Sequence, residues 1–100
     1  MRRALVLVLV VACHSKHAPR TYQVAIRGMQ FVPARLEVDV GDTAMWTNED
    51  VMPHTVSSPG IFDSMAMAPK QLWGWSFMQR GEWPYGCAFH PTMHGAVVVH

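Results

Sequence analysis

Short segments in which apolar and polar residues alternate cover most of the chain from residue 21 onward. Residues 22–26 and 35–40 show the pattern most clearly, because every second side chain is large and apolar. Alternation with a period of two predicts a β-strand that buries one face. We therefore expect strands at residues 22–26, 35–40, 43–47, 54–57, 71–78, 83–87 and 95–99, with a crossing segment at residues 29–33.

Turn residues separate these segments, as at residues 41–42 (Gly-Asp) and 58–60 (Ser-Pro-Gly). No stretch shows helical periodicity, and residues 61–69 are compatible with a loop or a single helical turn. Pro84 within a predicted strand indicates an edge position or a missing donor that faces outward. Seven or eight short strands joined by turns predict an all-β fold, a β-sandwich of about 7–8 strands. Leu36, Val38 and Val40 are expected to point inward. In the other predicted strands one face is shared by Ala44 and Trp46, by Trp73, Trp75 and Phe77, and by Trp83, Tyr85 and Cys87.

The N-terminus has a different pattern. Two arginines precede an unbroken apolar run at residues 4–11, which is typical of a secretory signal and too short to span a membrane. Residues 10–13 (Val-Val-Ala-Cys) resemble a bacterial lipobox, in which Cys13 is acylated and becomes the mature N-terminus. The alternative is a leader cut elsewhere, with Cys13 lost or left free. We predict a signal peptide at residues 1–12, a tether at residues 13–20 and one domain at residues 21–100.

Composition is compatible with one small globular domain. Half of the 100 residues are hydrophobic and ten are aromatic, which is enough to fill a compact core. Without Arg2 and Arg3, six basic residues face seven acidic ones, and the basic residues are scattered. The chain therefore carries no basic patch of the kind that binds nucleic acid. His14 and His17 of the tether are expected to be solvated rather than to bind a specific metal.

Candidate chemistry is concentrated in residues 85–95, where Cys87, His90 and Met93 follow one another at Cys-x-x-His-x-x-Met spacing. His54 supplies a second imidazole about thirty residues upstream. Two imidazoles, one thiolate and a weak axial thioether are the ligands of a blue-copper electron-transfer site. Taken singly, a Cys or a Met is more often a core residue, and Cys with His also binds zinc. The combination of spacing, His54 and surrounding strands favours copper.

These residues resemble the cupredoxin family of type 1 blue copper proteins, most of all its amicyanin and plastocyanin groups. The short Cys-x-x-His-x-x-Met loop is similar to that of the amicyanins. Residues 36–48, Leu-x-Val-x-Val-Gly-Asp-Thr-x-x-Trp-x-Asn, are similar to the strand pair that precedes the first histidine ligand. The resemblance covers residues 22–99 and implies a Greek-key cupredoxin sandwich with one copper ion at one end.

The resemblance also implies roles for individual residues. His54, Cys87, His90 and Met93 would hold the metal, and Asn48 would brace the metal loops through hydrogen bonds near the cysteine. An ordinary turn asparagine is the alternative for Asn48. The uncharged residues near the ligands would form a docking patch for redox partner proteins, and they are Met52, Pro53, Phe89 and Pro91.

The function expected from these observations is a non-enzymatic, monomeric electron carrier in the periplasm or cell envelope of a bacterium, held to the membrane surface through Cys13. A copper chaperone or buffer is the alternative, and its support is Met65 and Met67. A copper oxidoreductase domain is a further alternative, but the chain has no His-x-His pair for extra copper ligands. A binuclear copper centre would need a second cysteine in the ligand loop.

Overall fold

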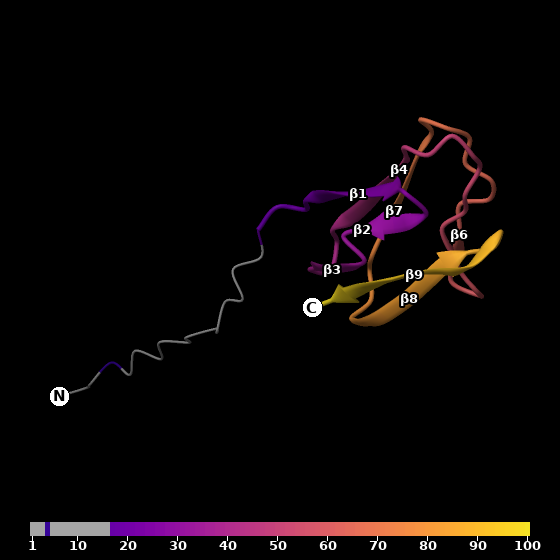
Figure 1. The fold of residues 1–100 in the computed structure, drawn as a ribbon. Helices are drawn as coiled ribbons and strands as arrows, with labels where there is room; N and C mark the ends of the chain where they lie inside the picture. Colours follow the sequence, from indigo (N-terminus) through magenta and orange to yellow (C-terminus); the bar gives the residue numbers. More distant parts are fainter. Residues whose placement is uncertain (1–3, 5–16) are drawn as a thin grey trace.

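The computed structural model describes residue 4 and residues 17–100 (Figure 1). The predicted signal peptide, apart from residue 4, and the predicted acylation site Cys13 lie outside the described residues. Among the described residues there is no helix long and apolar enough to cross a membrane. The described strands are β1 (Thr21–Arg27), β2 (Gln30–Val32), β3 (Arg35–Val38), β4 (Thr43–Asn48), β5 (Ser57–Ser58), β6 (Phe62–Asp63), β7 (Leu72–Ser76), β8 (Gly81–Cys87) and β9 (His90–Val99).

The strands form two sheets, with strand orders β2-β1-β4-β7 and β3-β9-β8-β5-β6. Strand β1 is parallel to β4, and β3 is parallel to β9, although neither pair is consecutive in the chain. Such pairs require the chain to cross between the sheets, as in Greek-key folds. The predicted all-β sandwich is therefore confirmed.

The core lies between the two sheets, and the alternation in the sequence identifies much of it. Val24 and Ile26 of β1, with Ala44 and Trp46 of β4, are at most 1% exposed. Trp46 Nε1 donates to the hydroxyl of Tyr85 in β8 at 3.1 Å. Burial raises the pKa of Tyr85 to about 12, so its hydroxyl stays protonated and neutral in the core.

Gly95 of β9 stands opposite Tyr85 in the β8–β9 ladder. A Cβ at Gly95 would overlap the Tyr85 ring, so the absence of a side chain lets the aromatic ring lie across the neighbouring strand. The Tyr85 ring therefore packs directly on the backbone of Gly95, and this contact joins the two strands that carry Cys87 and His90.

Several details differ from the sequence-based expectation. The predicted strand at residues 54–57 is reduced to a bridge at His54 and the two-residue β5. Strand β9 begins at His90 rather than Gly95, because its pairing with β8 continues to Cys87 past a bulge at residues 86–87. Part of the segment 61–69 is extended, since it contains β6 and a bridge from Met67 to His54. Trp75 is 37% exposed, because β7 is at the edge of its sheet.

Pro84 does not lie in an edge strand, because β8 has β9 on one side and β5 on the other. Strand β5 is only two residues long and pairs with β8 at Gly86 alone. On that side the Ser58 hydroxyl donates to the Pro84 carbonyl at 2.8 Å. The N–H that Pro84 lacks would point to this same side, so its absence does not interrupt the hydrogen bonds between β8 and β9.

The last residues of the predicted tether pack against the domain. Asp42, which is 1% exposed, accepts hydrogen bonds from the backbone N–H groups of Arg20 and Asp39 at 2.8 and 2.9 Å. The expectation that His17 is solvated is wrong, because its Nε2 lies 2.6 Å from the Asp39 carboxylate. Asp42 and His17 together fix the point at which the chain enters β1.

Asp42→Asn is expected to lower the free energy of unfolding by about 2 kcal/mol at neutral pH, because two charge-assisted hydrogen bonds are weakened. Burial by itself raises the pKa of Asp42, but the N–H groups of Arg20 and Asp39 and the nearby His17 hold it below the usual range. A lowered folded-state pKa means that this stabilisation is present above the ordinary aspartate pKa and is lost as the pH falls through the lowered value.

Urea unfolding of Asp42→Asn and wild type at several pH values tests this, and the difference should shrink in acid. Glu49→Gln is the control, because Glu49 is 45% exposed and only pairs with Arg27 at 3.6 Å. Its effect should stay below about 0.5 kcal/mol. An equal loss in both variants would contradict the role given to Asp42.

Candidate metal centre

The predicted ligand residues meet at one end of the sandwich. Cys87 is the last residue of β8 and His90 is the first residue of β9. His54 comes from a different part of the chain, and its backbone exchanges two hydrogen bonds with Met67, with N···O distances of 3.3 and 2.8 Å. The sandwich therefore brings His54 to the β8–β9 turn and holds it there through the main chain.

The three strongest donors point at a common space. Cys87 Sγ lies 3.5 Å from His90 Nδ1 and 3.8 Å from His54 Nδ1. All three ligand atoms lie within 4.8 Å of one another, and the two imidazole rings meet edge to face with centroids 4.9 Å apart. A metal bound at roughly 2.0 Å to nitrogen and 2.3 Å to sulfur with tetrahedral angles requires S···N separations of about 3.5 Å. The observed separations therefore fit a single metal ion.

Burial distinguishes the ligands from one another. His54 is 0% exposed, Met93 is 2% exposed and Cys87 is 5% exposed, whereas His90 is partly exposed. Met93 is on β9 with His90, three residues further along the chain. Of the four predicted ligands, His90 is therefore the one with an edge open to solvent.

Cys87 is held by a residue that the sequence analysis missed. The backbone N–H of Thr55 donates to Cys87 Sγ at 3.3 Å. The Thr55 hydroxyl accepts a hydrogen bond from the N–H of Ala88 at 2.7 Å, which ties the His54 segment to the residue after the cysteine. A donor aimed at the sulfur stabilises the thiolate and adjusts its basicity. Nothing in the residue pattern marks Thr55 except its position next to His54.

His54 is oriented by a second residue that the sequence analysis missed. Its Nε2 lies 2.8 Å from Asp50 Oδ2. A carboxylate can only accept, so Nε2 carries the proton and the Nδ1 lone pair is free to bind a metal. The Asp50 carboxylate also accepts from the N–H groups of Gly28 and Met29, at 2.7 and 3.0 Å.

The charge on Asp50 is stabilised by this environment. Partial burial by itself would raise the pKa of Asp50, but the N–H groups of Met29 and Gly28, together with the His54 imidazole, hold it below the usual range. Asp50 therefore stays ionised around neutral pH and connects the β1–β2 turn to a ligand histidine.

Asn48 braces the site from the other side of His54. It is fully buried, and its Nδ2 donates to the carbonyl oxygens of Met52 and Met67 at 2.9 and 3.0 Å. Its Oδ1 accepts from the N–H of Asp50 at 3.0 Å. These partners belong to the segments that flank His54, whereas the hydrogen bond to the cysteine sulfur comes from Thr55.

The residues predicted to form a docking patch are exposed. Met52 is 40% exposed and Phe89 is 53% exposed, and Pro53 and Pro91 are also exposed. Val51, which the sequence analysis did not single out, is 90% exposed in the same loop as Met52. Exposed apolar side chains therefore flank the partly exposed His90 in the sequence, and others directly precede His54 on the second ligand-bearing segment.

Comparison with known proteins agrees with this fold and donor set. The model of the cupredoxin-like domain family matches residues 2–99. Amicyanin of Paracoccus denitrificans is 37% identical over 82 residues, covering 76% of this chain and 63% of that protein. Amicyanin-alpha of Methylorubrum extorquens is 31% identical over 83 residues, covering 77% of this chain and 70% of that protein. The matches span a little under two thirds of the length of the two Paracoccus amicyanins.

Solved structures show the same likeness. A Cu(I) structure of an amicyanin variant is 32% identical and has a TM-score of 0.75, with 80% of this chain and 82% of that chain covered. A reduced amicyanin variant has a TM-score of 0.76 at 32% identity and covers 85% of this chain. The chain therefore belongs to the cupredoxin family. Within that family it is similar to the amicyanins, in agreement with the short ligand loop.

Proposed function

We propose that this protein is a small type 1 copper protein that carries single electrons between redox partners in the bacterial cell envelope. The observation that carries the proposal is the convergence of Cys87 Sγ with the Nδ1 atoms of His54 and His90. The names of the relatives, which include copper-containing amicyanin structures, support the same conclusion. The proposed ligands are His54, Cys87, His90 and the axial Met93.

The chain supplies a rigid, mostly buried cage for the ion. When bound, copper supplies a one-electron couple, and the protein sets its ligands and surroundings. Main-chain bonds hold His54, the β8–β9 hairpin holds Cys87 and His90, and Thr55 and Asp50 orient the sulfur and an imidazole. A cage that cannot rearrange much keeps the structural change on electron transfer small, which favours fast transfer.

His90 is the proposed exit for the electron. It is the ligand with a solvent-facing edge, and it is flanked by the exposed apolar residues Phe89 and Pro91. With Met52 and Pro53 these residues form the proposed docking patch. A small apolar face around one conducting side chain suits the weak and brief complexes of electron-transfer proteins.

We also propose that the protein acts as a lipid-anchored monomer. The support is the sequence of residues 1–13, in which an apolar run ends at a lipobox-like cysteine. Acyl chains on Cys13 would hold the domain stably at a membrane surface. Residues 13–16 would then link the anchor to His17, whose imidazole contacts Asp39 of the domain.

Copper storage or delivery is the less well supported alternative. Its sequence support was the pair Met65 and Met67, but Met67 is fully buried and bridges to His54. Of the two thioethers, only that of Met65, which is 70% exposed, is accessible to an incoming ion. The Met65–Met67 pair on which this alternative rested therefore does not form a pair of exposed thioethers.

Copper loading followed by visible spectroscopy and voltammetry tests the electron-carrier proposal. One equivalent of Cu(II) should give an intense blue colour from thiolate-to-copper charge transfer and one reversible one-electron wave. A colourless protein that retains zinc tightly would overturn the proposal. Rapid loss of Cu(I) to a mild chelator would instead favour copper handling.

A further inference from the structure

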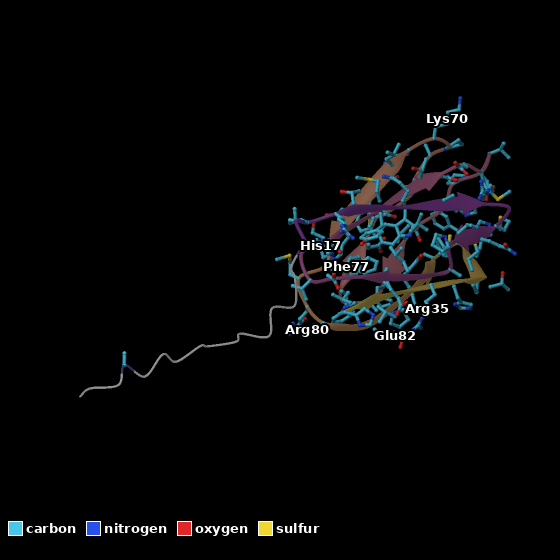
Figure 2. All side chains as sticks on the ribbon, turned by 90° about the vertical axis from the view of Figure 1, so that its left-hand side faces the viewer. His17, Arg35, Lys70, Phe77, Arg80 and Glu82 are labelled. Carbon is cyan, nitrogen blue, oxygen red and sulfur yellow. The ribbon has the colours of Figure 1, made fainter. Side chains whose placement is uncertain are left out.

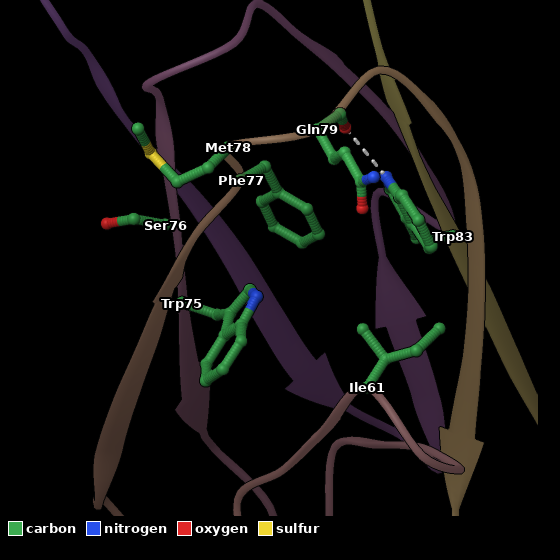
Figure 3. A pocket seen from close by; sticks show the side chains of 7 residues that line it. All are labelled: Ile61, Trp75, Ser76, Phe77, Met78, Gln79 and Trp83. Atoms are coloured by element: carbon green, nitrogen blue, oxygen red, sulfur yellow. Dashed lines mark hydrogen bonds between the residues drawn. The ribbon is translucent and has the colours of Figure 1, made fainter.

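An apolar groove of about 200 Å³ is lined by residues of β7, of the β7–β8 connection and of β8, together with Ile61 (Figure 3). We call it the aromatic groove, because two tryptophans and a phenylalanine line it. Trp83 Nε1 donates to the carbonyl of Gln79 at 3.1 Å, so the indole N–H is satisfied within the groove wall. The lining residues are Ile61, Trp75, Ser76, Phe77, Met78, Gln79 and Trp83.

The rim of the aromatic groove is exposed. Met78 is 70% exposed, Ile61 is 43% exposed and Trp75 is 37% exposed. Adjacent apolar side chains that remain in water are typical of an interaction surface. The tryptophan and methionine side chains make the groove suitable for an apolar partner.

The N-terminal segment enters the domain beside this groove. His17 Nε2 contacts the Asp39 carboxylate at 2.6 Å, and the carbonyl of the neighbouring Asp42 accepts the N–H of Phe77 at 2.9 Å. Figure 2 shows His17, Phe77 and Arg80 at one end of the sandwich, far from Lys70. The backbone N–H of Lys70 bonds to the carbonyl of Asn48, next to the metal centre.

Chain length brings the anchor to the same place. His17 is four positions after Cys13. Four residues of extended chain reach at most about 14 Å. Strand β8 begins at Gly81, beside the groove, and ends at the ligand Cys87. Its length of roughly 20 Å separates the groove end of the molecule from the metal end.

We propose that the aromatic groove and Met78 lie against the surface of an anionic lipid bilayer, with the metal centre turned away from it. The inference rests on the proposed lipid anchor at Cys13 but not on the proposed copper chemistry. Indole rings favour the headgroup region, where the apolar ring and polar N–H are both accommodated.

The charges next to the groove fit an anionic surface. Arg80 follows Met78 and Gln79 directly, and basic residues near a membrane are attracted by anionic headgroups. Two exposed carboxylates have cationic or titratable partners: Glu82 lies 3.3 Å from Arg35, and Asp39 contacts His17. Asp63, two residues after Ile61, accepts hydrogen bonds from Ser57 and Met65 instead. The paired carboxylates of Glu82 and Asp39 therefore repel a negative surface less strongly than unpaired carboxylates would.

Two methionines give a matched probe of this surface. Met65 and Met78 are both 70% exposed, but Met65 follows β6 and lies two residues before the bridge between Met67 and His54. Because oxidation of methionine follows its exposure, peroxide should modify both at similar rates in solution. On a membrane that covers the groove, only Met78 should be protected.

The experiment uses the full chain, recovered from bacterial membranes and reconstituted into vesicles of phosphatidylethanolamine and phosphatidylglycerol. Floated vesicles are treated with dilute peroxide, and peptide masses report each methionine. Met78 oxidation should slow by about tenfold, with Met65 unchanged. Equal rates for Met78 with and without vesicles, protection of Met65 as well, or no flotation would overturn the inference. Protection of Met78 by raised protein concentration without lipid would indicate a second copy of the chain and would also overturn it.

The mass of the N-terminal peptide separates this inference from the anchor. An acylated Cys13 with an unprotected Met78 would leave the anchor standing and overturn the membrane-facing groove. An unmodified N-terminus with a protected Met78 would overturn the anchor and sustain the groove. Neither result depends on which metal the centre holds.

Discussion

Cys87→Ser is expected to abolish the intense visible absorption of the copper-loaded protein while the sandwich stays folded. The colour requires charge transfer from a thiolate, and Cys87 is the free cysteine that the described part of the chain contains. A serine hydroxyl is nearly the same size and can still accept the hydrogen bond from Thr55, so the buried position tolerates it. Visible spectra of the two proteins measure the loss, and urea unfolding of the metal-free forms measures the fold.

His94→Asn is the control for Cys87→Ser. His94 is exposed and lies in β9 between Met93 and Gly95, close to the centre in sequence but outside the proposed ligand set. Its replacement should leave the absorption unchanged. Persistence of the blue band in Cys87→Ser would mean that another sulfur supplies the thiolate, and would contradict the ligand assignment.

Residue type, period and spacing were sufficient to predict the sandwich and to single out Cys87 and His90, whose Sγ and Nδ1 atoms lie 3.5 Å apart. The alternation in residues 22–26 identifies the buried face of β1, because a strand places every second side chain on one side. Cysteine and histidine at short spacing restrict the chemistry to soft or borderline metals. Both signals are local, and the sequence contains them in full.

The supporting contacts could not be predicted in the same way. Asp50 meets His54 across a non-helical loop and receives hydrogen bonds from the β1–β2 turn, more than twenty residues earlier in the chain. Thr55 meets Cys87 across 32 residues of sequence. Such contacts depend on how the two sheets are placed, and they leave no periodic trace. The pairing that starts β9 at His90 is likewise a property of the hairpin and its bulge.

The two ends of the sandwich have different functions in the proposed arrangement. One end gathers His54, Cys87 and His90, and the other joins the N-terminal segment beside the aromatic groove. An anchored domain that rests on its groove end would present the partly exposed His90 to partner proteins. In this arrangement the proposed electron exit would lie where a membrane does not obstruct it.

Asp50 acts directly on a proposed ligand through its hydrogen bond with the His54 imidazole. Its carboxylate fixes the proton of His54 on Nε2 and so directs the Nδ1 lone pair toward Cys87 Sγ, 3.8 Å away. The carboxylate is itself held by the N–H groups of Gly28 and Met29. Removing it would free the imidazole to change tautomer and would also leave two backbone donors without their acceptor.

Asp50→Ala is therefore expected to weaken copper binding by about 10- to 100-fold, as is typical when the carboxylate partner of a ligand histidine is lost. Competition with a chelator of known affinity measures the change, and urea unfolding of the metal-free protein shows whether the domain is still folded under those conditions. Glu49→Ala is the matched control, because it removes an adjacent carboxylate whose contact is with Arg27 rather than His54. Equal losses in both variants would mean that net charge, and not the contact with His54, sets the affinity. An unchanged affinity in Asp50→Ala would mean that the main-chain bonds between His54 and Met67 are enough to orient the imidazole.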